Sequence, residues 1–170
     1  MGIVGKDIYA DTLLKLKSKN NYTLQSSQNK TLVKTRVISQ RQQMVRIDRE
    51  EPFSLSSEIK NRIQSVLNKV SIDGIIISDY AKGSVTKKIM EMFKRKARND
   101  QIPIIVDPKP PNFPLYSRVD GITPNQQEAE QIINKKITTD QDALRAARQI
   151  RKKFYSNFCL ITRGDKGITA

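Results

Sequence analysis

Apolar and polar positions alternate along this chain with two different periods. Residues 31–39 and 43–48 alternate at every second position, as in the run Val33, Lys34, Thr35. A period of two is typical of a strand with one covered face and one face in water. We therefore expect two half-exposed antiparallel strands, although the connecting Gln-Arg-Gln lacks the Asn-Gly signal of a tight hairpin.

A period of three to four residues marks other segments as helices. Helices are predicted near residues 9–16, 55–70, 85–97 and 143–154. Short apolar runs predict the tail of a buried strand at GIVG and further strands at residues 73–78, 102–107, 119–123 and 157–162. Buried strands that alternate with amphipathic helices favour an α/β fold, a doubly wound and mostly parallel sheet with helices on both faces. The strands near residues 31–48 are expected to project from it as a small β lid.

Length and composition are compatible with one folded domain. The chain has 170 residues, of which 37% are hydrophobic, and this length can bury a sizeable core. Histidine is absent, which excludes imidazole catalysis, and the single cysteine, Cys159, excludes an internal disulfide. We expect Cys159 to be a buried, reduced thiol. Neither a signal-peptide pattern nor a run of membrane-spanning length occurs, so we expect a cytoplasmic protein with no membrane partner.

The chain is strongly basic, since 31 Lys and Arg against 17 Asp and Glu give a net charge of +14. Such a charge can attract nucleic acid or membrane surfaces. Many of the basic residues lie on two expected helices, within 87–98 and 145–153, without interleaved aromatic side chains or a nucleic-acid-binding signature. We therefore favour solvated helix faces, and keep nucleic-acid binding as a weaker alternative.

Polar clusters occur where the expected parallel strands end: SDYAKG, DPKP, TPNQQE and TRGDKG. In a doubly wound sheet these ends lie along one edge, where ligands bind. Each cluster also has an ordinary structural interpretation, such as a turn at Asp107, a helix cap at Asn125 and Glu128, or a hairpin reversal at Gly164 and Gly167. Four clusters in order favour a binding site.

A resemblance to a known family rests on five segments, KTRVISQRQQMVRIDREE, SDYAKG, IIVDPK, ITPNQQEAE and LITRGDKG. Together they closely resemble the kinase domain of D-glycero-β-D-manno-heptose 7-phosphate kinase, a ribokinase-like carbohydrate kinase. That domain is often the first half of a bifunctional heptose kinase/adenylyltransferase. The resemblance covers nearly the whole chain in the family's order. It implies a ribokinase-like fold with a β lid, and a homodimer formed through that lid.

The resemblance also implies a reaction in which ATP gives its γ-phosphate to the anomeric hydroxyl of heptose 7-phosphate, a step toward ADP-heptose and lipopolysaccharide. Such an enzyme must align two anionic reactants and neutralise charge with Mg²⁺ and cationic donors. The ATP contacts of the family fall on Asn125, Gln126, Gln127, Glu128, Lys109, Thr162, Gly164 and Gly167, with Glu128 reaching Mg²⁺ through water. The contacts to the sugar phosphate fall on Lys34, Arg36, Gln43, Arg46, Asp79 and Lys82.

The sequence departs from the family in two segments. Family members carry a Gly-Gly-Ala-Ala-Asn segment near the start and a Gly-Ala-Gly-Asp helix start that supplies the anion hole and the catalytic aspartate, and neither occurs here. No catalytic residue is therefore assigned. We expect a partial kinase domain over residues 1–170, incomplete at both ends and inactive alone, with lid strands at about 31–48 and an α/β core at 1–30 and 55–170.

Three explanations of such a partial domain stay open: a piece of a longer enzyme, a degenerate remnant, or a chain completed by a partner. A different class of function is also open. The chain could be a non-catalytic protein that binds a nucleotide or sugar phosphate, or an interaction protein.

Overall fold

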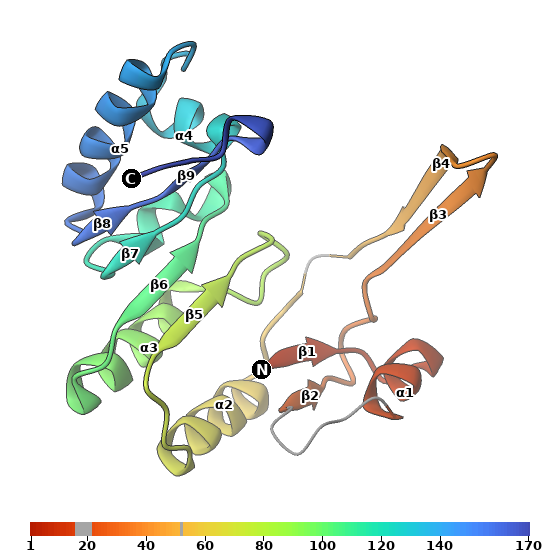
Figure 1. Cartoon of the computed structure of the whole chain (residues 1–170). Helices are drawn as coiled ribbons and strands as arrows, with labels where there is room; N and C mark the ends of the chain where they lie inside the picture. The colour runs from red at the N-terminus through yellow and green to blue at the C-terminus, as the bar shows by residue number, and fades with distance from the viewer. Residues whose placement is uncertain (16–21, 52) are drawn as a thin grey trace. The chain divides into compact units, whose positions relative to one another are not determined.

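The computed structural model describes residues 1–15, 22–51 and 53–170, which form two compact units (Figure 1). Unit 1 comprises residues 1–65 and 82–84, and unit 2 comprises residues 66–81 and 85–170. The helix predicted near residues 9–16 ends, at Leu16, outside the described residues. The predicted division into a lid and an α/β core has different boundaries and stays a prediction.

Unit 1 contains two small sheets of two strands each. β1 (Gly2–Val4) and β2 (Thr23–Gln25) pair in parallel, and α1 (Ile8–Lys15) lies between them in sequence. β3 (Val33–Ser39) and β4 (Gln42–Arg49) pair antiparallel, which confirms the strand pairing predicted from their period of two. The next helix, α2 (Ser57–Lys69), begins in unit 1 and ends in unit 2.

The β3–β4 ribbon is exposed on both faces. Val37 pairs with Val45 and Thr35 pairs with Ile47, so these four side chains share one face. The apolar members Val37, Val45 and Ile47 are nevertheless 45%, 46% and 49% exposed. The expectation of one covered face is wrong for these strands, because a two-stranded ribbon has no second layer against which to pack.

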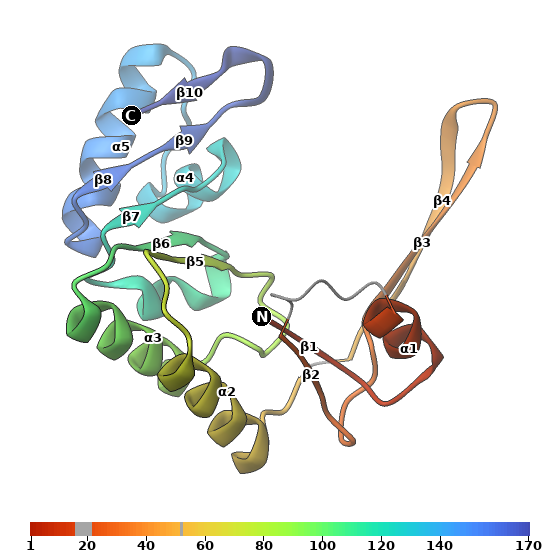
Figure 2. The same cartoon turned by 60° about the horizontal axis from the view of Figure 1, so that its bottom comes forward.

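Unit 2 is built on a four-stranded parallel sheet in the order β5-β6-β7-β8 (Figures 1 and 2). Its strands are β5 (Ile75–Ser78), β6 (Ile104–Asp107), β7 (Gly121–Ile122) and β8 (Phe158–Cys159). Each neighbouring pair is parallel, which confirms the predicted arrangement. A hairpin of β9 (Ile161–Thr162) and β10 (Ile168–Thr169), joined by the short 3₁₀ turn η2 (Gly164–Lys166), follows β8.

The helices of unit 2 begin at side chains that cap them. These helices are α3 (Lys87–Asp100), α4 (Gln126–Ile133) and α5 (Asp140–Phe154), and the 3₁₀ helix η1 (Pro110–Tyr116) precedes β7. Thr86, Asn125 and Thr139 each accept a hydrogen bond from the third backbone N–H of the helix that they precede, which satisfies an otherwise unpaired donor. Among the described helices, none combines the length and the hydrophobicity needed to cross a membrane.

The core of unit 2 lies on one face of this sheet. Ile77, Val106, Ile122 and Cys159 are paired across the four strands and are buried against side chains of α3, α4 and α5. Burial raises the pKa of the Cys159 thiol to about 12, in agreement with the buried, reduced cysteine expected from the sequence.

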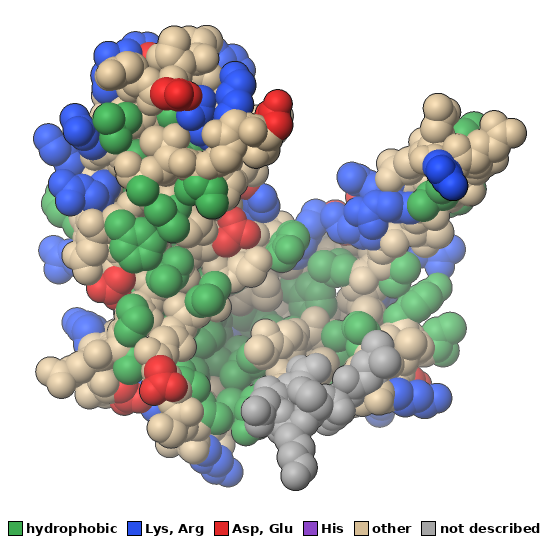
Figure 3. All heavy atoms as spheres, viewed as in Figure 1, with side chains coloured by type: hydrophobic (Ala, Val, Ile, Leu, Met, Phe, Trp, Pro, Cys, Tyr) green, Lys and Arg blue, Asp and Glu red, His purple; other side chains and the backbone are tan. Residues whose placement is uncertain are grey.

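The opposite face of the sheet is more open. Ile76 on β5 is 77% exposed, and Figure 3 shows hydrophobic side chains over this face. On β7, Gly121 has no side chain, and the ring of Phe158 on β8 lies where its Cβ would be. The α/β fold class is confirmed, but within residues 1–15, 22–51 and 53–170 no helix covers Ile76 on this face, in contrast to the expected helix layer on both faces. Right-handed connections between strands in consecutive order place their helices on the same face.

Candidate functional site

The carboxyl ends of β5 and β6 and the start of α4 bring together a polar cluster in unit 2. Asp79 follows β5, Asp107 ends β6, Lys109 lies two residues further, and Asn125 caps α4. A parallel ladder aligns the ends of neighbouring strands, since Ser78 pairs with Asp107. This is the edge at which the sequence predicted a site.

Asp79 lies at the centre of the cluster and is 1% exposed. Its Oδ1 accepts a hydrogen bond from the backbone N–H of Ala81 at 2.8 Å. Its Oδ2 accepts hydrogen bonds from Asn112 Nδ2 at 2.6 Å and from the Tyr116 hydroxyl. Burial, and then this bond to Asp79, raise the pKa of Tyr116. Both carboxylate oxygens of Asp79 are therefore used within unit 2, and the substrate contact predicted for Asp79 stays a prediction.

Asn112 and Tyr116 were not predicted from the sequence. They lie in the proline-rich segment that forms η1, in which no site residue was expected. The Tyr116 hydroxyl also accepts a hydrogen bond from the backbone N–H of Lys109 at 3.2 Å. The Asp79 carboxylate thus holds η1 and, through Tyr116, the backbone of Lys109.

Lys109 and Glu128 form an ion pair across the cluster. Glu128 is 5% exposed, and its second oxygen accepts a hydrogen bond from the backbone N–H of Asn125 at 2.9 Å. The Asn125 side chain in turn accepts from the N–H of Glu128 at 2.9 Å, which completes the predicted capping box. The hydrogen bond to Glu128 raises the pKa of Lys109. The structure thus brings together three of the predicted nucleotide-binding residues.

Gln126 and Gln127 lie away from this cluster, although the sequence placed them in the same motif. Gln126 Nε2 donates to the backbone carbonyl of Ile137 at 3.0 Å. Gln127 lines a separate hollow together with Glu130 and other residues of α4. Successive residues of an α-helix point about 100° apart, so neighbours of Glu128 in sequence need not share its direction.

Thr162, Gly164 and Gly167 lie on the β9–β10 hairpin. Both glycines have positive φ, 62° and 75°, and neither has a neighbouring atom within 4 Å of the place of a Cβ. Arg163, which precedes Gly164, is buried and donates to Asp140 at the start of α5 at 2.8 Å, a contact that the sequence did not indicate. The hairpin is therefore fixed at Arg163, while its two glycines face open space.

A second candidate site lies within unit 1. A cavity of about 760 Å³ is lined by charged and polar side chains that include Lys6, Asp7, Tyr9, Asp48, Arg49 and Glu50. Hydrogen bonds from the backbone of Thr31 and Ala10 lower the pKa of Asp7. Carboxylates, cations and an aromatic ring around one cavity suit a ligand with both hydroxyl groups and negative charge.

Glu50 pairs with two of the predicted substrate-binding lysines. Lys82 Nζ contacts Glu50 Oε2, and Lys34 Nζ lies 3.1 Å from Glu50 Oε1. Lys82 first, and then Lys34, lower the pKa of Glu50. The segment DREE contains this carboxylate, but nothing local to it indicated a partner 32 residues away.

The other predicted residues of the ribbon do not all lie together. Arg36 pairs across the ribbon with Arg46, and Arg46 Nη2 lies 3.0 Å from Asp48 Oδ2. Gln43 pairs with Ile38, beyond a register shift in the ladder. Lys34, Arg36 and Arg46 thus share one face, while the bulge separates them from Gln43.

Within the described part of the chain, the side chains around Glu128 do not form a metal-binding cage. The described residues include no group of three acidic, cysteine or histidine side chains placed to hold a metal ion. Each Glu128 oxygen accepts one hydrogen bond, from Lys109 or from the Asn125 N–H, and keeps a further lone pair. A contact to a metal-bound water, with Glu128 shared between Lys109 and the ion, is therefore compatible with this arrangement.

Comparison with known proteins gives relatives of the same name from several bacteria. The chain is 34% identical to the "Bifunctional protein HldE" of Methylobacillus flagellatus, covering 99% of this chain and 36% of that protein. It is 37% identical to the protein of the same name from Pelobacter propionicus, covering 82% of this chain and 29% of that one. The chain therefore spans about a third of the length of these relatives.

Solved structures with the same fold have low sequence identity to the chain. Ribokinase from Giardia lamblia has a TM-score of 0.75 at 19% identity, covering 98% of this chain and 54% of that one. The tetrameric inhibited form of phosphofructokinase-2 from Escherichia coli has a TM-score of 0.71 at 17% identity, covering 98% and 56%. The family model described as "pfkB family carbohydrate kinase" matches residues 1–170. The chain thus belongs to the pfkB family of carbohydrate kinases.

Proposed function

We propose that this chain is part of a kinase that transfers the γ-phosphate of ATP to the anomeric hydroxyl of heptose 7-phosphate. In this step the bond between the γ-phosphorus and the β,γ-bridging oxygen breaks, and ADP leaves. A new bond forms between that phosphorus and the anomeric oxygen, whose proton passes to a base that we do not assign to these residues. The observation that carries the proposal is the Lys109–Glu128 pair at the capped start of α4 in a chain of this family.

Lys109 is the residue that we propose for the phosphates of ATP. Its side chain is 31% exposed, so that the ammonium group can reach a ligand while it remains paired with Glu128. An ammonium has three donors, and an ion pair with one carboxylate oxygen leaves others free. Thr162 and the open glycines 164 and 167 would contribute backbone groups beside the nucleotide. Mg²⁺, when bound, would neutralise charge on the phosphates, with Glu128 as its water-mediated partner.

The acceptor is proposed to bind in the unit 1 cavity. Hydroxyl groups of a sugar can donate to the carboxylates of Asp7, Asp48 and Glu50, and its phosphate can accept from cations such as Lys82 and Lys34. The heptose specificity rests on the similarity to the HldE proteins and on the ribbon segment. Comparing the affinity for heptose 7-phosphate with that for fructose 6-phosphate tests it, and equal affinities would contradict it.

Replacement of Lys109 should weaken ATP binding. We expect Lys109→Gln to raise the dissociation constant for ATP with Mg²⁺ by about tenfold or more, because a hydrogen bond to a charged group contributes about 1.5–3 kcal/mol. Isothermal titration calorimetry measures this directly. Lys109→Arg should retain most of the affinity, and Lys135→Gln, at an exposed position just after α4, should leave it unchanged. An unchanged affinity in a folded Lys109→Gln variant would contradict the proposal.

A homodimer through the β3–β4 ribbon is also proposed. The apolar side chains of Val37, Val45 and Ile47 share one exposed face, and a second copy of the same ribbon would cover them. We expect Val45→Glu to shift sedimentation equilibrium from dimer to monomer. Asn61→Glu, which adds the same charge at an exposed position of α2, should not. A monomeric wild-type chain at all concentrations would exclude this dimer.

A further inference from the structure

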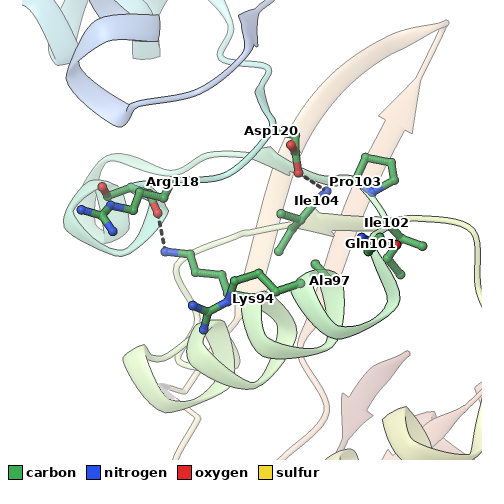
Figure 4. Close-up of a pocket in the computed structure, with 10 residues that line it drawn as sticks. Lys94, Ala97, Gln101, Ile102, Pro103, Ile104, Arg118 and Asp120 are labelled. Carbon is green, nitrogen blue, oxygen red and sulfur yellow. Dashed lines mark hydrogen bonds between the residues drawn. The ribbon is translucent and has the colours of Figure 1, made fainter.

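Unit 2 has a cavity at the edge of its sheet opposite the polar cluster. It measures about 670 Å³ and lies where α3 ends and β6 begins, next to the segment 117–120 (Figure 4). Strand β6 runs from Ile104, which lines this cavity, to Asp107, which belongs to the polar cluster. At about 3.3 Å per residue, the two places lie about 10 Å apart along the strand. The cavity therefore lies at the opposite end of β6 from the nucleotide position proposed above.

Three cations line the cavity: Lys94, Arg98 and Arg118. None of them has an ion pair within the described part of the chain, in contrast to Lys109, Lys82 and Lys34. Like charges that share a cavity repel one another, and an anionic ligand relieves that repulsion.

Lys94 is the best-positioned of the three cations. Its ammonium donates to the backbone carbonyls of Leu115 at 2.9 Å and Ser117 at 2.6 Å, which fixes it at the loop beneath Arg118 (Figure 4). An ammonium has three N–H donors, so one is left for a ligand. Burial lowers the pKa of Lys94, the nearby charge of Glu91 partly opposes this, and the charges of Arg118 and Arg98 lower the pKa further. An anion bound beside it would offset the repulsion between Lys94 and the two arginines.

Asp120 is the acidic residue of the lining, and its oxygens have other partners. Oδ2 accepts from the backbone N–H of Ile104 and Oδ1 accepts from Asn157 Nδ2, both at 2.9 Å. Three cations and one carboxylate leave an excess of 3 − 1 = +2 around the cavity. A phosphate monoester carries about −1.5 to −2 at neutral pH and matches this excess.

Arg118 has an unusual backbone. Its φ is +60°, and its N–H donates to the carbonyl of Phe154 at 2.6 Å, which holds this conformation. Such conformations are uncommon for residues other than glycine, and they cluster at ligand sites. Ala97, Ile102, Pro103 and Ile104 provide an apolar wall beside the cations, which suits an organic molecule that carries the phosphate.

We propose that this cavity is a second anion site, which binds a phosphate-bearing small molecule through Lys94, Arg98 and Arg118. The site is separate from the proposed nucleotide and acceptor positions, and it gives the fold a place where a phosphorylated metabolite can bind without occupying either. The guanidinium fork matches both phosphate and carboxylate in geometry, and the larger negative charge of a phosphate monoester favours it over a small monocarboxylate at this excess of positive charge.

The test is a titration of the ¹⁵N-labelled 170-residue chain with pyrophosphate, followed by NMR shifts of backbone amides. Ionic strength is held constant with sodium chloride, and acetate is the monocarboxylate comparison. We expect the amides of Ile102, Ser117 and Arg118 to shift along one saturable curve, and acetate to leave them in place. Lys109→Gln should not change this curve.

Two variants with equal loss of charge separate a specific site from general attraction. Arg98→Gln with Arg118→Asn should weaken the binding at these amides by about tenfold or more, since each removes a charged donor. Asparagine is chosen because it tolerates the positive φ at position 118. Lys87→Gln with Lys88→Gln, at exposed positions of α3, should leave the curve unchanged. The proposal would be overturned by any of three results: amide shifts that depend on ionic strength alone, equal shifts in the two double variants, or the same shifts with acetate.

Discussion

ADP release by the purified 170-residue chain, supplied with ATP, Mg²⁺ and heptose 7-phosphate, is expected to be at least about 10²-fold slower than release by a full-length heptose 7-phosphate kinase that carries the Gly-Ala-Gly-Asp segment. In the family that the sequence resembles, a Gly-Ala-Gly-Asp turn supplies the anion hole and the catalytic aspartate. That sequence does not occur in the 170 residues. Loss of one such donor costs about 10²–10³ in rate, and loss of a general base about 10²–10⁴.

The carboxylates of the polar cluster offer little replacement for that aspartate. Both oxygens of Asp79 and both oxygens of Glu128 are engaged by protein donors. Asp107 is the exception: burial, and then the nearby Glu128, raise its pKa, and it is only partly covered. A carboxylate with a raised pKa is a better proton acceptor than an ordinary one.

A coupled assay that follows ADP measures the difference, with heat-treated protein as the background. Rates for the chain within a few-fold of the comparison protein would contradict the expectation. In that case Asp107→Asn would be the decisive variant, because Asp107 is the remaining carboxylate of the cluster with a raised pKa. If the chain binds ATP but shows no turnover, the result supports the proposed nucleotide site and shows that the chain lacks only the catalytic step.

Replacement of Asp79 by alanine is expected to lower the free energy of unfolding by about 3 kcal/mol. The change removes the acceptor of Tyr116, Asn112 and the Ala81 N–H together. A buried donor left without a partner costs about 1–3 kcal/mol, and the Tyr116 hydroxyl is fully buried. The loss should also release the backbone of Lys109, which donates to the same hydroxyl.

Urea unfolding followed by circular dichroism measures this effect, with Asp73→Ala at an exposed position as the matched control. The Tyr116→Phe variant and the double variant complete a thermodynamic cycle. Because the two groups share one hydrogen bond, the double variant should lose less than the sum of the single losses. A loss below about 1 kcal/mol for Asp79→Ala, or full additivity, would show that Asp79 does not have this internal role.

Several features of the fold followed from local sequence patterns. The period of two predicted β3 and β4, and the short apolar runs predicted the parallel strands. Both patterns can be recognised from residues only a few positions apart in sequence. The Asn125–Glu128 capping box was predicted for the same reason. The family resemblance was carried by whole segments and is confirmed by the match over residues 1–170.

The pairing of charged side chains could not be obtained in this way. The sequence indicated that Lys34, Lys82 and Lys109 could bind phosphates. In the structure, Lys34 and Lys82 form ion pairs with Glu50, and Lys109 forms one with Glu128. These partners are 16, 32 and 19 residues away. Residues that far apart in sequence come into contact through the order of the strands and the rotation of a helix about its axis. Neither can be predicted from the local period of apolar residues.

The sequence by itself determined the family, the order along the chain of the four parallel strands of unit 2, and the helix start at Asn125, because these depend on contiguous residues. Only the tertiary structure decided that Asp79 is engaged by Tyr116, that Ile76 is exposed, and that Lys94 and Arg118 meet at one cavity. An apolar run predicts a strand but not how many of its faces are covered. The sequence of a basic helix shows how much positive charge the helix carries. Which of its cations lie close to cations of another segment depends on the segment that packs against the helix.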